Sequence, residues 1–99
     1  MDFVRAMEGF VDVVEAGSFA AAAHRRGSSA AAVTRQIAAL EEHLGTRLMQ
    51  RTTRRFSLTE MGQDFYERAK QILADIAETE AVIGQQALQP AGLLHISVP

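Results

Sequence analysis

Residues 18–59 read SFAAAAHRRGSSAAAVTRQIAALEEHLGTRLMQRTTRRFSLT. A short alanine-rich helix is predicted over residues 19–26 and a longer one over 29–44, because a serine precedes each helix and a glycine follows it. An arginine-rich segment with alternating apolar residues follows at 47–58. Two helices that meet at Gly27, with a hairpin after them, predict a helix-turn-helix with a two-stranded wing.

Amphipathic helices are also predicted on both sides of this stretch. Residues 3–16 carry apolar side chains at helical spacing, and residues 60–87 carry a longer apolar stripe that begins after Thr59. The predicted fold class is therefore mainly α, a winged helix-turn-helix of three helices and a two-stranded wing. A long linker helix of about 40 Å follows it.

The helix predicted over 29–44 turns an apolar stripe toward the core and its opposite face toward solvent. In a helix-turn-helix this second helix enters the DNA major groove. Arg35 lies on the outward face, and its planar guanidinium suits both guanine edges and phosphates. The residues that we expect to contact DNA, on this helix and at the wing, are Ser29, Ala30, Ala31, Thr34, Arg35, Ala38, Arg51, Thr53, Arg54 and Arg55.

For several polar side chains in this region, the sequence leaves two roles open. The Thr34 hydroxyl is expected to bind a phosphate, with packing or capping as the alternative. Arg51 either contacts a phosphate or pairs with a carboxylate that braces the wing. Arg25 is interpreted as a surface charge or a peripheral phosphate contact. Glu41 and Glu42 are interpreted as ordinary helix charges, because adjacent residues on a helix point apart.

Positive charge is concentrated in the middle of the chain. Seven arginines against two glutamates give residues 24–58 a net charge of +5. Residues 1–23 carry −3 and residues 59–99 carry −4, so the chain as a whole carries −2. We therefore expect a polyanion to bind the middle segment.

Composition excludes several other classes of protein. The hydrophobic fraction of 47% excludes general disorder, and the absence of cysteine excludes disulfides and thiolate metal sites. The histidines lack metal-ligand spacing, and no nucleophile beside a base and no glycine-rich phosphate loop is recognisable. No enzymatic activity, metal or cofactor is therefore expected. No stretch approaches the roughly 20 apolar residues of a membrane span, so a cytoplasmic protein is expected.

The stripe on the long helix predicts a second copy of the chain. A helix of this length extends past the small domain before it, so its far half needs another apolar surface to cover it. The first half, residues 61–69, is expected to pack on its own domain, and the second half, residues 72–83, on a partner subunit. The residues assigned to the dimer are Phe65, Ala69, Ile72, Leu73, Ile76, Thr79 and Ile83.

Residues 85–99, at the C-terminal end of the sequence, indicate a further domain. Glutamine, proline and glycine at 85–92 are typical of a hinge, and Leu94, Ile96 and Val98 alternate with polar residues as in a strand. A lone strand is not a stable unit. The sequence is therefore interpreted as a fragment that ends at the start of a second domain.

The motifs above are similar to the N-terminal domain of LysR-type bacterial transcription regulators. The resemblance covers residues 3–98, and its motifs include Glu15-x-Gly17-Ser18-Phe19, Leu40-Glu41-x-x-Leu44-Gly45 and Leu58-Thr59-x-x-Gly62. It implies a DNA-binding domain over 1–59, a dimerisation helix over 60–88, and a hinge and first strand of an effector-binding domain over 89–99. It also implies that dimers, or tetramers built from them, bind an interrupted inverted repeat in double-stranded DNA. A small-molecule effector would bind only through the absent C-terminal domain.

Three positions depart from the pattern of that family. Arg26 stands where a leucine usually packs the turn, so it is expected to extend to solvent or to a phosphate. Ala30 and Ala31 stand where many members of the family carry Gln, Pro or Ser; alanine cannot hydrogen-bond a base edge, although its methyl group can contact the methyl group of thymine. These alanines and the acidic net charge leave an alternative, a protein-interaction or dimerisation module with weak or non-specific DNA binding. A third interpretation is RNA binding. The basic segment argues against it, because it has few aromatic side chains that could stack on the bases of a single strand.

Overall fold

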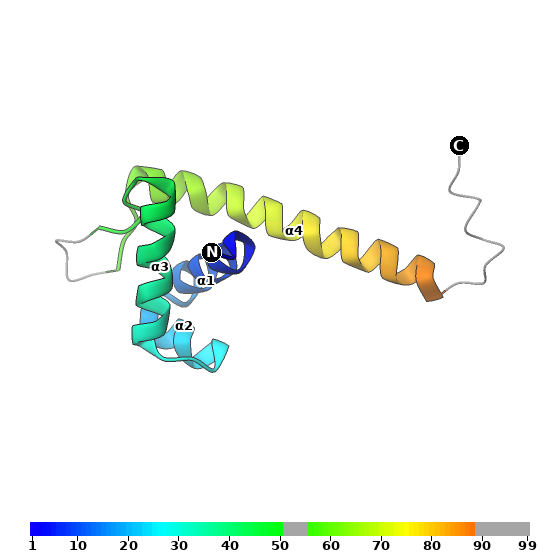
Figure 1. Cartoon of the computed structure of the whole chain (residues 1–99), viewed down its shortest axis with the longest axis horizontal. Helices are drawn as coiled ribbons and strands as arrows, with labels where there is room; N and C mark the ends of the chain where they lie inside the picture. The colour runs from blue at the N-terminus through cyan, green and yellow to red at the C-terminus, as the bar shows by residue number, and fades with distance from the viewer. Residues whose placement is uncertain (51–55, 89–99) are drawn as a thin grey trace.

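Four helices make up the described part of the chain. The structure is a computed structural model that describes residues 1–50 and 56–88. The helices are α1 (Phe3–Ala16), α2 (Phe19–Arg26), α3 (Ala30–Leu44) and α4 (Glu60–Leu88). These bounds confirm the predicted helices to within one residue. Figure 1 shows the three short helices grouped at one end, with α4 extending away from them.

The helix ends carry the caps that the sequence predicts. The hydroxyls of Ser18 and Ser29 each accept a hydrogen bond from the backbone N–H three residues on, at 3.0 and 3.1 Å. Gly27 and Gly45 adopt left-handed backbone conformations, with φ of 66° and 72°, and their N–H groups bond back to the helices that they end. These glycines stop α2 and α3, and Gly27 supplies the turn between them.

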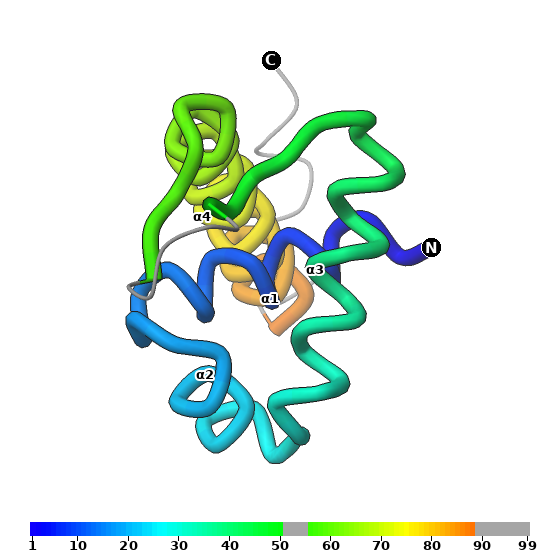
Figure 2. The backbone as a smooth tube through the Cα atoms, turned by 90° about the vertical axis from the view of Figure 1, so that its left-hand side faces the viewer, coloured from blue at the N-terminus to red at the C-terminus, as the bar shows by residue number. Residues whose placement is uncertain are grey.

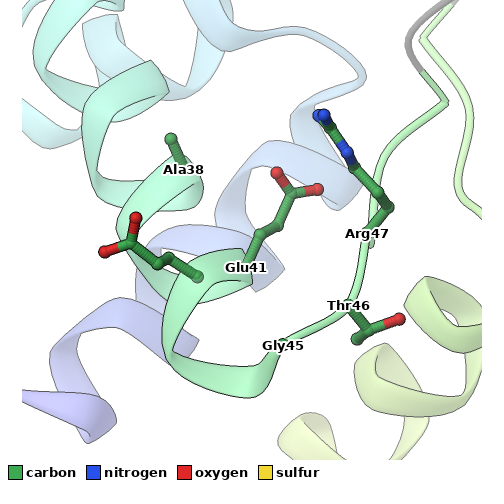
Figure 3. A pocket seen from close by; sticks show the side chains of 6 residues that line it. Ala38, Glu41, Gly45, Thr46 and Arg47 are labelled. Atoms are coloured by element: carbon green, nitrogen blue, oxygen red, sulfur yellow. The ribbon is translucent and has the colours of Figure 1, made fainter.

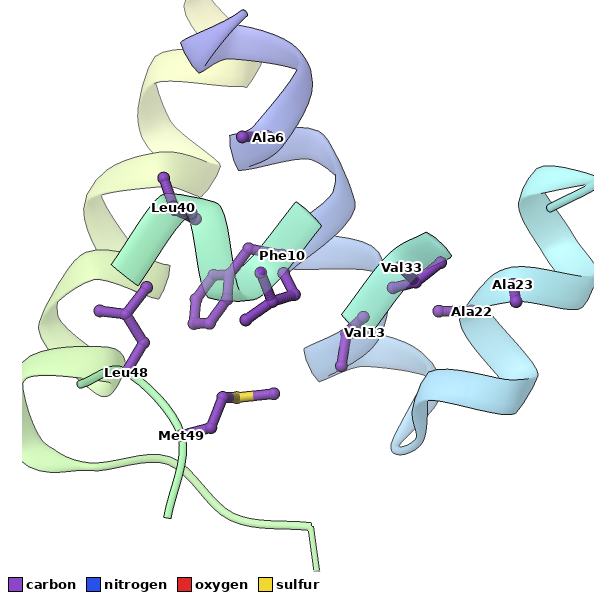
Figure 4. Close-up of a cluster of buried hydrophobic side chains, with 10 residues drawn as sticks. Ala6, Phe10, Val13, Ala22, Ala23, Val33, Leu40, Leu48 and Met49 are labelled. Carbon is purple, nitrogen blue, oxygen red and sulfur yellow. The ribbon is translucent and has the colours of Figure 1, made fainter. Parts of the chain in front are cut away.

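The core lies where α1, α2 and α3 meet. Phe10 and Leu40 are fully buried, and Leu48 and Met49, which follow α3, close the cluster from the side of the wing (Figure 4). α1 packs against each of the other helices. Figure 2, a view close to the axis of α4, shows α2 and α3 grouped around α1. Leu44, the last apolar residue of α3, is 36% exposed because the helix ends there.

The first half of α4 packs against α1 of the same chain, which corrects part of the predicted dimer surface. Phe65 makes an edge-on contact with Phe10 at 5.4 Å between ring centroids. Ala69 is fully buried with Met7 and Val11 of α1. Spacing reveals the stripe but not what covers it, so Ala69 is corrected to a core residue of its own chain, while the assignment of the half-buried Phe65 to a second copy stays a prediction.

The far half of α4 leaves its stripe uncovered within the described chain. Ile72 is 44% exposed and Ile83 is 58% exposed. An open groove of about 320 Å³ runs along this face, with apolar walls formed mainly by Ile72, Ile76 and Thr79. Leu73 is shared, because it also packs against the α1 cluster. The uncovered surface therefore begins near residue 72.

The two arms of the predicted wing run antiparallel at their base. Met49 and Leu58 form a β-bridge, and the Gln50 N–H donates a hydrogen bond to the Ser57 carbonyl at 3.1 Å. Residues 50 and 56–58 show no regular strand beyond this bridge. Residues 51–55 and 89–99 lie outside the described residues, so the two-stranded wing and the strand predicted at the C-terminus stay predictions.

Candidate nucleic-acid interface

The face of α3 that points away from the core matches the predicted recognition face. Ala31, Thr34, Arg35 and Ala38 are all exposed. Within the described residues, the Arg35 guanidinium has no hydrogen-bond or ion-pair partner. Glu42 continues the same face one turn further on and is also exposed. This surface offers one free guanidinium between small methyl groups, which is a shape that fits into a groove of DNA.

The two hydroxyls assigned to DNA both bond to the α3 backbone. The Thr34 hydroxyl donates to the Ala30 carbonyl at 2.8 Å. It has to leave that carbonyl before it can donate to a phosphate. The Ser29 hydroxyl accepts its bond from the Ala32 N–H, so its own proton stays available to a phosphate. Ser29 is therefore the better prepared of the two phosphate ligands, with Ala30 beside it at the exposed start of the helix.

Glu41 is a functional residue that the sequence reading missed. It was interpreted as an ordinary helix charge, but it is only 6% exposed. Its Oε2 atom accepts hydrogen bonds from the backbone N–H groups of Leu48, at 2.8 Å, and Met49, at 3.1 Å. A carboxylate on α3 thus holds the first arm of the wing. The two acidic neighbours differ because Glu41 faces this arm and Glu42 faces solvent.

Thr59, which lies between the second arm of the wing and α4, bonds to the first arm. The Thr59 N–H donates to the Leu48 carbonyl at 2.9 Å, and its hydroxyl donates to the Arg47 carbonyl at 2.6 Å. The same hydroxyl accepts a bond from the Gly62 N–H at 2.9 Å, which caps α4. A Cβ on Gly62 would lie 2.0 Å from the Leu48 carbonyl oxygen, so only glycine allows this approach. The base of the wing is therefore fixed between α3 and α4.

An open cavity of about 460 Å³ separates the recognition face from the base of the wing. Its walls carry Ala38, Glu42 and Arg47, and Figure 3 shows Arg47 and Glu41 extending from opposite sides. Arg47 is exposed and brings a positive charge beside α3. The neighbouring carboxylates make this cavity a poor phosphate site, so we assign it no ligand.

Arg26 forms an ion pair rather than extending to solvent. Its guanidinium donates a hydrogen bond to the Asp12 carboxylate, which ties the end of α2 to α1. The pair neutralises the charge of the Arg26 side chain, which is only 21% exposed. The sequence alone did not reveal it, because the two residues are 14 positions apart.

The wing residues assigned to DNA are not placed by the structure. Arg51, Thr53, Arg54 and Arg55 lie outside the described residues. Their roles stay predictions. Among the described residues, no group of histidine, aspartate and glutamate side chains has the arrangement of a metal site. The helices of the described part include none long and apolar enough to cross a membrane.

A family profile and individual relatives of this chain point to the same protein family. The profile described as "Bacterial regulatory helix-turn-helix protein, lysR family" matches residues 4–63. The uncharacterized HTH-type transcriptional regulator YhjC of Escherichia coli is 43% identical over 99 residues, which are all of this chain and 33% of that protein. The regulator CrgA of Neisseria meningitidis (strain 8013) is 42% identical over 87 residues, 88% of this chain and 29% of CrgA. The chain thus spans about a third of the length of these relatives.

Solved structures agree with the sequence comparison. The BenM DNA-binding domain in complex with benA site 1 DNA superimposes with a TM-score of 0.85 at 32% identity, covering 91% of this chain and all of that one. The CbnR DNA-binding domain in complex with DNA gives a TM-score of 0.75 at 39% identity, covering 90% of this chain and all of that one. The chain belongs to the LysR family of bacterial helix-turn-helix regulators and has the fold of their DNA-binding domains.

Proposed function

We propose that this chain is the DNA-binding part of a dimeric, sequence-specific transcription regulator of the LysR type. The observation that carries the proposal is the exposed face of α3, with an unpaired Arg35, in a fold that matches domains solved on DNA. α3 enters the major groove, and base readout falls mainly on Arg35. Ala31 and Ala38 favour thymine beside it, because their methyl groups contact the thymine methyl.

The wing supplies the second contact in this proposal. Arg54 and Arg55 reach the adjacent minor groove or the backbone, and Arg51 and Thr53 bind near them. The base of the wing supports this role, because Glu41 of α3 and Thr59 before α4 fix the first arm by hydrogen bonds at residues 47–49.

A second copy covers the far half of α4. The uncovered apolar groove on α4 is the reason for assigning a second copy to this face. The residues proposed to contact the second copy are those of the predicted dimer surface that remain accessible in the single chain. These residues are Ile72, Leu73, Ile76, Thr79 and Ile83. Two joined domains read two half-sites of an interrupted inverted repeat. Full-length regulators of this kind, in the cytoplasm, would add an effector domain and act as dimers or as tetramers built from them.

The protein-interaction alternative is not favoured. It rested on Ala30, Ala31 and the acidic total, but the BenM and CbnR domains with this fold have been solved on DNA. Glu42 is the acidic residue that extends this face, but Arg35 has no carboxylate partner among the described residues and keeps its charge free for DNA.

Replacing Arg35 by alanine tests the proposal. If Arg35 reads a base, Arg35→Ala weakens binding to a duplex selected by the wild-type chain by about 1–3 kcal/mol and binding to random duplex much less. Arg68→Ala is the matched control, because Arg68 lies on α4 and pairs there with Asp64. Equal weakening on both duplexes makes Arg35 a phosphate contact, and no weakening contradicts the assigned face.

A further inference from the structure

A second, smaller pocket lies on the opposite flank of the recognition helix. It has a volume of about 150 Å³ and lies between α1, the turn after α2 and the first two turns of α3. The volume is close to that of one phosphate group with a few waters. The residues that line it are Arg5, Arg26, Ser28, Ala32, Val33 and Gln36.

Three polar side chains converge on this pocket without partners of their own. Within residues 1–50 and 56–88, the side chains of Arg5, Ser28 and Gln36 form no hydrogen bond or ion pair. Arg26 also lines the pocket, but Asp12 neutralises its charge. Arg5 therefore supplies the net charge of the pocket, and the other two side chains supply neutral donors.

The side-chain amide of Gln36 packs closely against α1 at Gly9. A Cβ built on Gly9 would lie 2.2 Å from the Gln36 Oε1 atom. Because Gly9 has no side chain, there is room for the Gln36 amide at the wall of the pocket. The amide oxygen faces α1, which leaves the amide nitrogen as a donor.

The position of the pocket relative to α3 is what points to DNA. At 100° per residue, Ala32 and Gln36 lie one step around the helix from Ala31 and Arg35, on the side where α1 packs. The cavity at the base of the wing lies on the other side of the recognition face. A helix in a major groove about 12 Å wide has a phosphate backbone on each side of it.

We propose that Arg5, Ser28 and Gln36 form a phosphate pocket that holds the DNA backbone on the α1 side of the recognition helix. The inference rests on the proposed function and adds a contact that neither the helix-turn-helix pattern nor the wing predicts. Arg5 binds the phosphate by charge, and the Ser28 hydroxyl and Gln36 amide donate to its oxygens. The contact fixes orientation and does not discriminate sequence.

The first arm of the test measures binding to duplex DNA over a range of salt concentrations. Arg5→Gln is compared with Arg68→Gln, an exposed arginine on α4 that serves as the control. Arg5→Gln is expected to reduce the slope of log K against log salt by about 1 and to weaken selected and random duplex equally, by about three- to tenfold. An unchanged slope overturns the assignment to DNA.

The second arm titrates inorganic phosphate without DNA and follows the Gln36 side-chain amide by NMR, with chloride at equal ionic strength as the control. A shift specific to phosphate, lost in Arg5→Gln, supports the pocket even if the wild-type chain fails to select DNA. No shift together with a reduced slope supports a pocket that forms only on the DNA backbone. A shift with an unchanged slope contradicts the DNA assignment in favour of free phosphate, and no response in either arm removes the pocket.

Discussion

Removing the Glu41 carboxylate is expected to destabilise the whole domain. Glu41→Ala takes away the one oxygen that accepts hydrogen bonds from the Leu48 and Met49 N–H groups. The side chains of both residues belong to the core and are 1% and 3% exposed. Bulk water therefore has little access to the two donors that the substitution leaves unpaired.

The size of the effect follows from those two donors. A buried donor left unpaired costs about 1–3 kcal/mol, so two cost about 2–6 kcal/mol. Water entering the space left by the carboxylate offsets part of this, and we expect about 2–4 kcal/mol. A domain of this size has about 5–15 kcal/mol in total, so its melting temperature is expected to fall by at least about 8 °C. Glu41→Gln keeps an oxygen without the charge, so its cost lies between alanine and wild type.

Urea unfolding followed by circular dichroism measures this effect. Glu42→Ala is the matched control, because it removes the same group one residue later at an exposed position. We expect the control to change the free energy of unfolding by less than about 0.5 kcal/mol. If Glu41→Ala and Glu42→Ala have the same free energy of unfolding, the reasoning on the two buried N–H groups is refuted.

Three further substitutions test the packing around the interface. Gly62→Ala places a Cβ 2.0 Å from the Leu48 carbonyl oxygen, a backbone atom that cannot move aside, so urea unfolding should show a loss of more than about 2 kcal/mol. Gly9→Ala meets only the end of the Gln36 side chain, and the gain of about 1 kcal/mol in helix propensity offsets the shift. We expect Gly9→Ala to lower the free energy of unfolding by less than about 1 kcal/mol. Equal losses in Gly9→Ala and Gly62→Ala would contradict the claim that a backbone neighbour resists the added Cβ more than the end of a side chain does. Ile76→Glu puts a charge in the uncovered groove of α4 and should convert dimers to monomers without lowering helicity, and an unchanged mass by light scattering would count against the dimer surface.

The helices could be predicted from the sequence because their signals are local. Serine and glycine at the ends of α2 and α3 set their bounds through caps and left-handed turns that need no other part of the chain. The outward position of Arg35 followed from helical spacing alone. The same reasoning predicted the long α4, whose stripe continues past the domain.

Interactions between distant residues could not be predicted in this way. Glu41 and Glu42 look alike in sequence, and only the placement of the first wing arm buries one of them. The stripe on α4 is continuous in sequence, but α1 covers its first half, so Ala69 was assigned to the wrong partner. Nothing in the sequence placed Arg5 in a binding site, because the pocket that it lines forms only where the start of α3 packs beside α1.

Selection from a random duplex library, at near-physiological salt, tests the central claim most directly. The wild-type chain is incubated with the library and the bound sequences are read out. The account predicts enrichment of an inverted repeat whose half-sites share a guanine for Arg35 and thymines near it, with loss of the guanine preference in Arg35→Ala. A folded, dimeric chain that enriches no sequence would contradict the claim that this surface reads DNA.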